Sequence, residues 1–127
     1  MTPSRGRRQE KPYVVAIPIP SLNRHGGALA PDAIEEWVKR AEREFTACFG
    51  GATSLRAPGT NIVGGKVLYE AGQVLVVSGC NNRAEFLRHR DRIDAFATEM
   101  GDQLDQAAVF VLAFDSDSFL VELGGTS

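Results

Sequence analysis

A glutamate near the middle of the chain is the strongest candidate for chemistry. Glu70 ends a short strand-like run, directly after Tyr69 and opposite a glycine-rich segment. A carboxyl group that lies in a half-buried cleft can act as a general base. Glu70 is therefore the candidate catalytic residue. The alternative is a purely structural charge at a strand edge, or an ion-pair partner of Arg56, and this is the more common situation.

Three further residues are candidates for ligand binding. Tyr69 neighbours Glu70, and His25 lies in the polar loop Arg24–Gly27 before a predicted helix, where N–H groups can receive an anion. Gln106 lies at the entrance to a late strand, where its amide could bind a ligand or satisfy backbone groups. The loop carries neither phosphate-binding glycine pattern, so an ordinary connection is the favoured interpretation.

No other catalytic or metal-binding motif is present in the sequence. His25 and His89 are the only histidines and lie on separate predicted elements, which argues against a zinc site. Asp115 and Asp117 are interpreted as turn formers, because a calcium loop needs a longer acidic pattern. The GxSxG and HExxH patterns are absent. We therefore expect no metal and no cofactor.

The two cysteines, Cys48 and Cys80, have neither disulfide-scaffold nor zinc-ligand spacing. Cys48 falls on the apolar stripe of a predicted helix, so it is expected to be a small buried hydrophobic residue. Cys80 lies at a predicted strand end and is expected to be the more accessible of the two.

Charge is unevenly distributed along the chain. Residues 1–12 contain four basic residues against Glu10, whereas the whole chain has a net charge of −2, so residues 13–127 are acidic. An acidic body argues against dedicated nucleic-acid binding. The longest strongly apolar run, 107–114, is far too short to span a membrane, and residues 1–12 do not resemble a secretory signal. A cytoplasmic location is the expectation.

The hydrophobic pattern predicts two helices and several strands. Apolar residues at helical spacing, including Trp37, Phe45, Phe86 and Phe96, predict helices over 32–49 and 83–104. Strands are predicted over 13–19, 52–57, 66–70, 73–78, 107–114 and 119–123. Residues 115–118 have the composition of a hairpin loop joining the last two strands.

This order predicts an α+β protein with the ferredoxin-like split βαβ fold, an antiparallel sheet with two helices on one face and an extra C-terminal hairpin strand. The expected organisation is a flexible basic tail over 1–12, one domain over 13–123 and a flexible C-terminus over 124–127. One sheet face would remain open, and its apolar composition predicts that a second copy covers it in a homodimer.

Several short motifs occur together in this chain: Phe49–Thr53, Ala57–Gly59, Leu68–Glu70, Val74–Val77 and Asp105–Val109. With these motifs, roughly residues 13–123 resemble a group of small, functionally uncharacterised bacterial proteins. The chain departs from that group at 60–62, where the group usually carries a tryptophan. The resemblance implies a ferredoxin-like fold and no established activity.

Two function classes follow. The first is a dimeric binding or accessory protein without a catalytic site, whose partner would be a protein docking on the sheet edge or the loop side. The second is a small-molecule enzyme, of the isomerase or cofactor-independent oxygenase type, with a pocket near Glu70. A polar outer sheet face would count against the first class, and a fully exposed Glu70 would count against the second.

Overall fold

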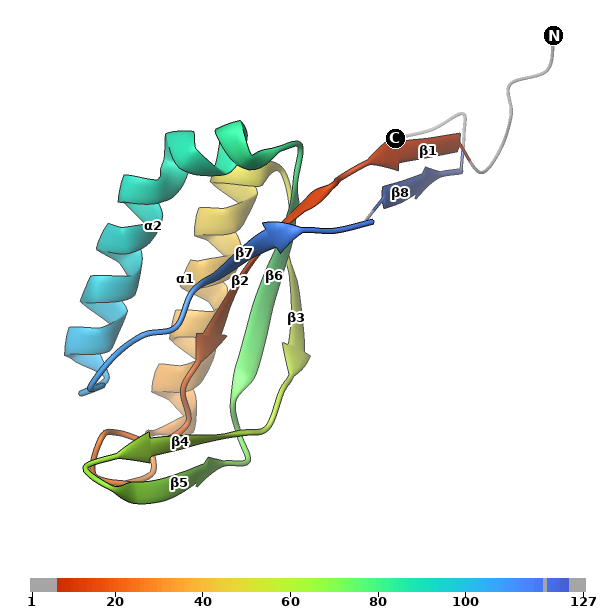
Figure 1. The fold of residues 1–127 in the computed structure, drawn as a ribbon. Coiled ribbons are helices and arrows are strands. Elements are labelled where there is room, and N and C mark those ends of the chain that lie inside the picture. Colours follow the sequence, from red (N-terminus) through yellow and green to blue (C-terminus); the bar gives the residue numbers. More distant parts are fainter. Residues whose placement is uncertain (1–6, 118, 124–127) are drawn as a thin grey trace, which may run out of the picture.

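The computed structural model describes residues 7–117 and 119–123. Two helices and eight strands follow one another along the described chain (Figure 1). In order they are β1 (Arg7–Glu10), β2 (Tyr13–Ile19), α1 (Pro31–Phe49), β3 (Thr53–Arg56), β4 (Gly59–Val63), β5 (Lys66–Glu70), β6 (Val74–Cys80), α2 (Arg83–Gln103), β7 (Leu112–Asp115) and β8 (Phe119–Glu122).

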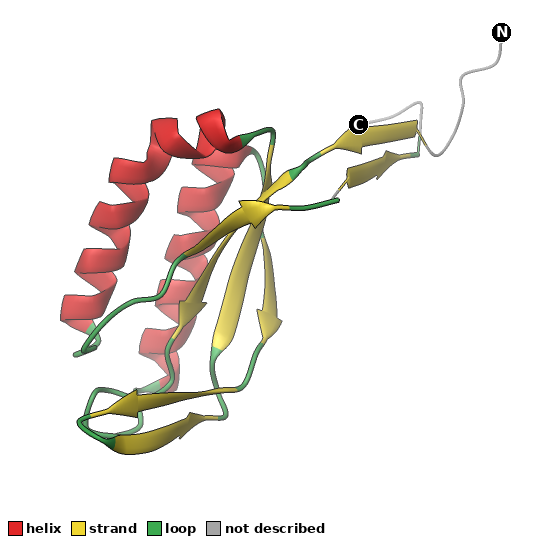
Figure 2. Ribbon diagram, in the orientation of Figure 1, coloured by secondary structure: helices red, strands yellow, loops and turns green. Residues whose placement is uncertain are grey.

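The central sheet has four antiparallel strands in the order β3-β6-β2-β7. Both helices lie on the same side of this sheet (Figure 2). Strand β2 is central: it pairs along its whole length with β6, and over Tyr13–Ala16 with β7. The prediction of a ferredoxin-like α+β fold with both helices on one face is confirmed. Two small two-stranded sheets, β4-β5 and β1-β8, extend this core.

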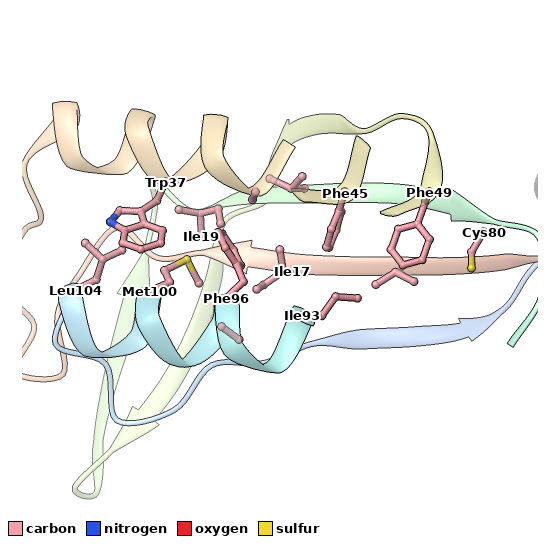
Figure 3. Packing of buried hydrophobic residues seen from close by; sticks show 14 of the residues in the cluster. Ile17, Ile19, Trp37, Phe45, Phe49, Cys80, Ile93, Phe96, Met100 and Leu104 are labelled. Atoms are coloured by element: carbon pink, nitrogen blue, oxygen red, sulfur yellow. The ribbon is translucent and has the colours of Figure 1, made fainter. Parts of the chain in front are cut away.

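The hydrophobic core fills the space between the sheet and the helices (Figure 3). Successive side chains of a strand point to opposite faces, so the odd-numbered residues of β2 and the even-numbered residues of β6 face the helices. The helices contribute the apolar stripes that the sequence predicts. The buried set includes Val15, Ile17, Ile19, Val76, Cys80, Trp37, Phe45, Ile93, Phe96 and Met100.

The opposite face of the sheet, which we call the outer face, is also apolar. Register and strand alternation place on it Val14, Ala16, Pro18, Thr53, Leu55, Leu75, Val77, Gly79, Leu112 and Phe114. Their neighbours bury Val14 and Ala16, whereas Leu55 and Phe114 are nearly half exposed. Neither helix covers this face (Figure 2).

Three strand predictions are wrong in detail. The sequence predicts turn and connection over residues 59–63, but they form β4. The apolar run 107–114 forms a strand only from Leu112, because Pro18 and Pro20 offer no N–H to a partner beyond the paired part of β2. Strand β8 does not form a hairpin with β7 and pairs instead with β1.

The cysteine prediction is reversed. Cys80 is fully buried, because it shares the helix-facing side of β6 with Val76 and Ser78, while Cys48 is only half-buried. Burial is also the main reason why the pKa of Cys80 is raised to about 11.

The predicted N-terminal tail lies partly outside the described residues. Its residues Arg7–Glu10 form β1, which pairs with β8 and projects from the body as a ribbon (Figure 1). Residues 1–6 and the predicted C-terminal tail, 124–127, lie outside the described part.

Candidate functional site

A pocket of about 520 Å³ lies at the end of the sheet where β2 leaves it. Three parts of the chain form its walls: the end of β2 with the loop after it, the β4-β5 hairpin, and the irregular segment that precedes β7. Ile62 and Phe110, at the rim, are 74% and 67% exposed. The lining also includes Arg24, Asn61, Glu70 and Gln106.

Glu70 lies in this pocket and is only 3% exposed. Its Oε1 accepts hydrogen bonds from the backbone N–H groups of Ser21 and Leu22, each at 3.0 Å. Its Oε2 accepts a bond of 2.8 Å from the side-chain amide of Asn61. All three donors are neutral, and no salt bridge joins Glu70 to a described lysine, arginine or histidine. The carboxylate is thus bound without a positive charge.

Strand alternation explains how Glu70 and Asn61 meet. In the β4-β5 hairpin Gly59 pairs with Glu70 and Asn61 pairs with Leu68, so these four residues share one face. Leu68 is buried on that face. Sequence reasoning missed Asn61 because its segment is not predicted to be a strand. The period-two pattern of Lys66–Glu70, extended to a hairpin partner, would have identified it.

Gln106 reaches the same pocket and also binds the loop that follows β2. Its side-chain amide donates to the carbonyls of Leu22 (2.7 Å) and Leu104 (3.0 Å). The pocket therefore brings together Glu70 and Gln106 of the four candidates. The N–H of Gln106 also donates to the carbonyl of Gly101 at the end of α2. Gln106 thereby ties the loop after β2 and the end of α2 to the segment that precedes β7.

Tyr69 and His25 do not line the pocket. Tyr69 is 63% exposed, because it precedes Glu70 on β5 and therefore points to the other face of the hairpin. The His25 side chain is 76% exposed and lies 3.9 Å from Asp105. Its loop is closed by Asn23, whose side-chain oxygen accepts bonds from the N–H groups of His25 and Gly27.

A second bound carboxylate, Glu85, lies at the start of α2, where β6 ends. The N–H and the side-chain amide of Asn81 donate to it at 3.1 and 2.8 Å. Burial acts to raise the pKa of Glu85, but these bonds and that of the Cys80 thiol outweigh it, and the pKa is lowered. Lys11 contributes a nearby positive charge, and Arg88 lies 3.9 Å away. Glu85 therefore belongs to a helix-capping cluster.

In the described part of the chain no group of three or more His, Cys, Asp or Glu residues could hold a metal ion. The same part contains no helix with the length and apolar character needed to cross a membrane.

Comparison with known proteins gives structural neighbours only. No family model and no curated protein matches the chain. A phage SAM lyase in complex with S-methyl-5'-thioadenosine superposes with a TM-score of 0.63 at 16% identity, over 91% of this chain and 93% of that one. The phage SAM lyase in the apo state gives a TM-score of 0.59.

A second kind of neighbour is a mutant form of CutA1 from Pyrococcus horikoshii OT3. It gives a TM-score of 0.51 at 14% identity, over 84% of each chain. At such low identity these likenesses establish the fold alone. The chain is thus similar to other small α+β proteins, which agrees with the coarse part of the predicted resemblance.

Proposed function

We propose that this protein is a self-associating binding protein that holds a small molecule in the pocket at Glu70. The observation that carries the proposal is a buried carboxylate, bound only by neutral donors, that faces a pocket. The volume of about 520 Å³ lies within the range typical of ligand sites, roughly 300–1,000 Å³. Apolar walls with a few convergent polar groups are also typical of such sites.

The charge of Glu70 favours a cationic ligand. An uncompensated negative charge in a partly enclosed site attracts a positive group more strongly than it would in water. Neutral donors hold the carboxylate in place but do not neutralise its charge. A sulfonium compound such as S-adenosylmethionine combines a cation with a nucleoside body that has an aromatic base and polar hydroxyl groups. Because a SAM lyase is among the structural neighbours, S-adenosylmethionine and S-methyl-5'-thioadenosine are the first compounds to test.

The binding experiment is calorimetric titration of both compounds into the wild type and the Glu70→Gln variant. We expect the variant to bind S-adenosylmethionine at least tenfold more weakly, and to lose less affinity for the uncharged thioadenosine. The control is Glu36→Gln, which removes an exposed carboxylate on α1. No binding by the wild type, or equal binding by wild type and Glu70→Gln, would refute the proposal.

An enzyme at the same site is the second candidate, because Glu70 could act as a base toward a bound substrate. Chromatography of the titrated samples shows whether S-adenosylmethionine is converted, which distinguishes the two candidate functions. Conversion of S-adenosylmethionine by the wild type and its loss in Glu70→Gln would favour the enzyme. Binding without conversion would favour the binding protein.

The proposed self-association places a second copy on the outer face. An apolar sheet face of this kind is unusual at the surface of a protein that has no partner. The ribbon formed by β1 and β8 adds the exposed apolar residues Phe119 and Val121, and Leu123, directly after β8, is exposed as well. The solution mass, measured by light scattering, tests the expected homodimer.

Leu75→Glu, on the outer face, is expected to shift the solution mass to that of one chain. Leu87→Glu is the matched control, because Leu87 is exposed on α2, on the helix side of the sheet. A wild type with the mass of one chain, or a Leu75→Glu variant with unchanged mass, would contradict self-association through this face.

A further inference from the structure

Arg24 is a charged residue of the pocket that the proposed role of Glu70 does not use. Its backbone N–H donates to the carbonyl of Asp105 at 2.8 Å. Its Nε lies 2.9 Å from Oδ1 of Asp105, and its Nη2 donates to the carbonyl of Gln106 at 2.7 Å. The backbone bond and the two guanidinium contacts together fix Arg24 against the segment after α2.

Part of the Arg24 guanidinium group remains available for a ligand. A guanidinium group has five N–H donors in a rigid fork. Asp105 takes the Nε donor and the Gln106 carbonyl takes one Nη2 donor. Within the described part of the chain, both Nη1 donors and one Nη2 donor remain, on the outer edge of a side chain that is 43% exposed. That edge has the geometry that binds a carboxylate through two parallel hydrogen bonds.

The pocket therefore has a negative and a positive group in its walls. Leu22, which donates to Glu70, is only two residues before Arg24, so the two charged groups belong to adjoining parts of the wall. Asp105 balances the positive charge of Arg24 at the Nε edge of the guanidinium group. Asp105 itself does not line the pocket. The rest of the lining combines apolar side chains with neutral polar ones, among which are the amides of Asn61, Gln73 and Gln106.

We infer that Arg24 is a carboxylate-binding subsite of this pocket, so that the ligand is dipolar, with its cationic group at Glu70 and a carboxylate at Arg24. The inference rests on the proposed function and adds the class of ligand, an α-amino acid group joined to a larger body. In the Arg24–Gly27 loop, the group that binds the anion is thus the Arg24 side chain and not the backbone N–H groups.

Two probe compounds in which the sulfur atom is uncharged test the subsite by calorimetry. S-Adenosylhomocysteine carries the amino acid group, and S-methyl-5'-thioadenosine has a methyl group in its place. We expect the wild type to bind the first at least tenfold more tightly than the second. In Arg24→Gln this ratio is expected to fall at least fivefold, because the carboxylate loses its partner, while the affinity for the thioadenosine changes less. Arg90→Gln, which removes an exposed arginine of α2, is expected to keep the wild-type ratio.

The outcomes separate the inference from the proposed function. A ratio near one in the wild type, or an unchanged ratio in Arg24→Gln, overturns the subsite while the pocket stands. Failure of the wild type to bind either probe overturns the proposed function itself. If Arg24→Gln does not fold, Arg24→Lys decides, because it keeps the charge and loses the fork. A reduced ratio in that variant supports the subsite, and an unchanged ratio overturns it.

Discussion

Two carboxylates at opposite ends of strand β6 have similar partners and different surroundings. Each accepts a bond from an asparagine side chain, and backbone N–H groups donate as well, two to Glu70 and one to Glu85. Lys11 and Arg88 lie near Glu85, and Glu85 belongs to the first turn of α2. Glu70 has neutral partners only and faces a pocket. Hydrogen bonds alone therefore do not identify a binding carboxylate; the uncompensated charge and the adjoining space do.

The largest expected effect is on stability at the pocket end. Glu70→Ala removes the acceptor for two N–H groups and one side-chain amide, and each buried donor left without a partner costs about 1–3 kcal/mol. We expect the free energy of unfolding to fall by about 3 kcal/mol, measured by urea denaturation. Glu85→Ala removes one arm of a helix cap and is expected to cost about 1 kcal/mol. Equal losses of stability in the two variants would contradict the expected difference between Glu70 and Glu85.

A smaller effect is expected at Asp105, which holds Arg24 at the pocket end. Asp105 has a φ of 50°, in the left-handed region that asparagine tolerates better than alanine. Both substitutions remove the negative charge that pairs with Arg24, but the asparagine oxygen still accepts from Arg24, so their difference reports the backbone together with this hydrogen bond. Asp105→Ala is expected to be about 1 kcal/mol less stable than Asp105→Asn in thermal unfolding. Equal stability would show that this conformation is not strained.

The smallest effect is a pH dependence at the Glu85 end. Because the folded-state pKa of Glu85 is lowered, the stabilisation that it contributes is present above its ordinary pKa and is lost as the pH falls through the folded-state value. The wild type should therefore lose more stability than Glu85→Gln when the pH is lowered from about 5 to about 3. Parallel curves for the two proteins would show that Glu85 does not titrate with folding.

Much of the fold could be predicted from local patterns. The helices follow from apolar residues at helical spacing, and β2 and β6 follow from dense β-branched runs. The pairing of β8 with β1 could not be predicted, because these strands are far apart in the sequence and no local turn specifies their contact. The sequence does not predict strand β4, because Gly59, Thr60 and Asn61 have a weak strand propensity. The strand forms through its pairing with β5.

The site could be predicted only in part. Glu70 and Gln106 were identified from their residue types and positions, and the structure places both in one pocket. Tyr69 is a candidate only because it precedes Glu70 in the sequence. Adjacent strand residues point to opposite faces, so it does not reach the pocket. The role of Asn61 and the fixing of Arg24 by Asp105 depend on contacts between distant segments, which no local pattern encodes.

A nitrogen-15 NMR titration of the protein with S-adenosylmethionine tests directly whether a ligand binds in the pocket at Glu70. The side-chain amides of Asn61 and Gln106 and the N–H groups of Ser21 and Leu22 lie around the pocket and report on its occupancy. We predict saturable shifts at these four positions, and little change at Asn81 and Glu85 at the other end of β6. Shifts confined to the Glu85 end, or no shifts at all, would contradict a ligand site at Glu70.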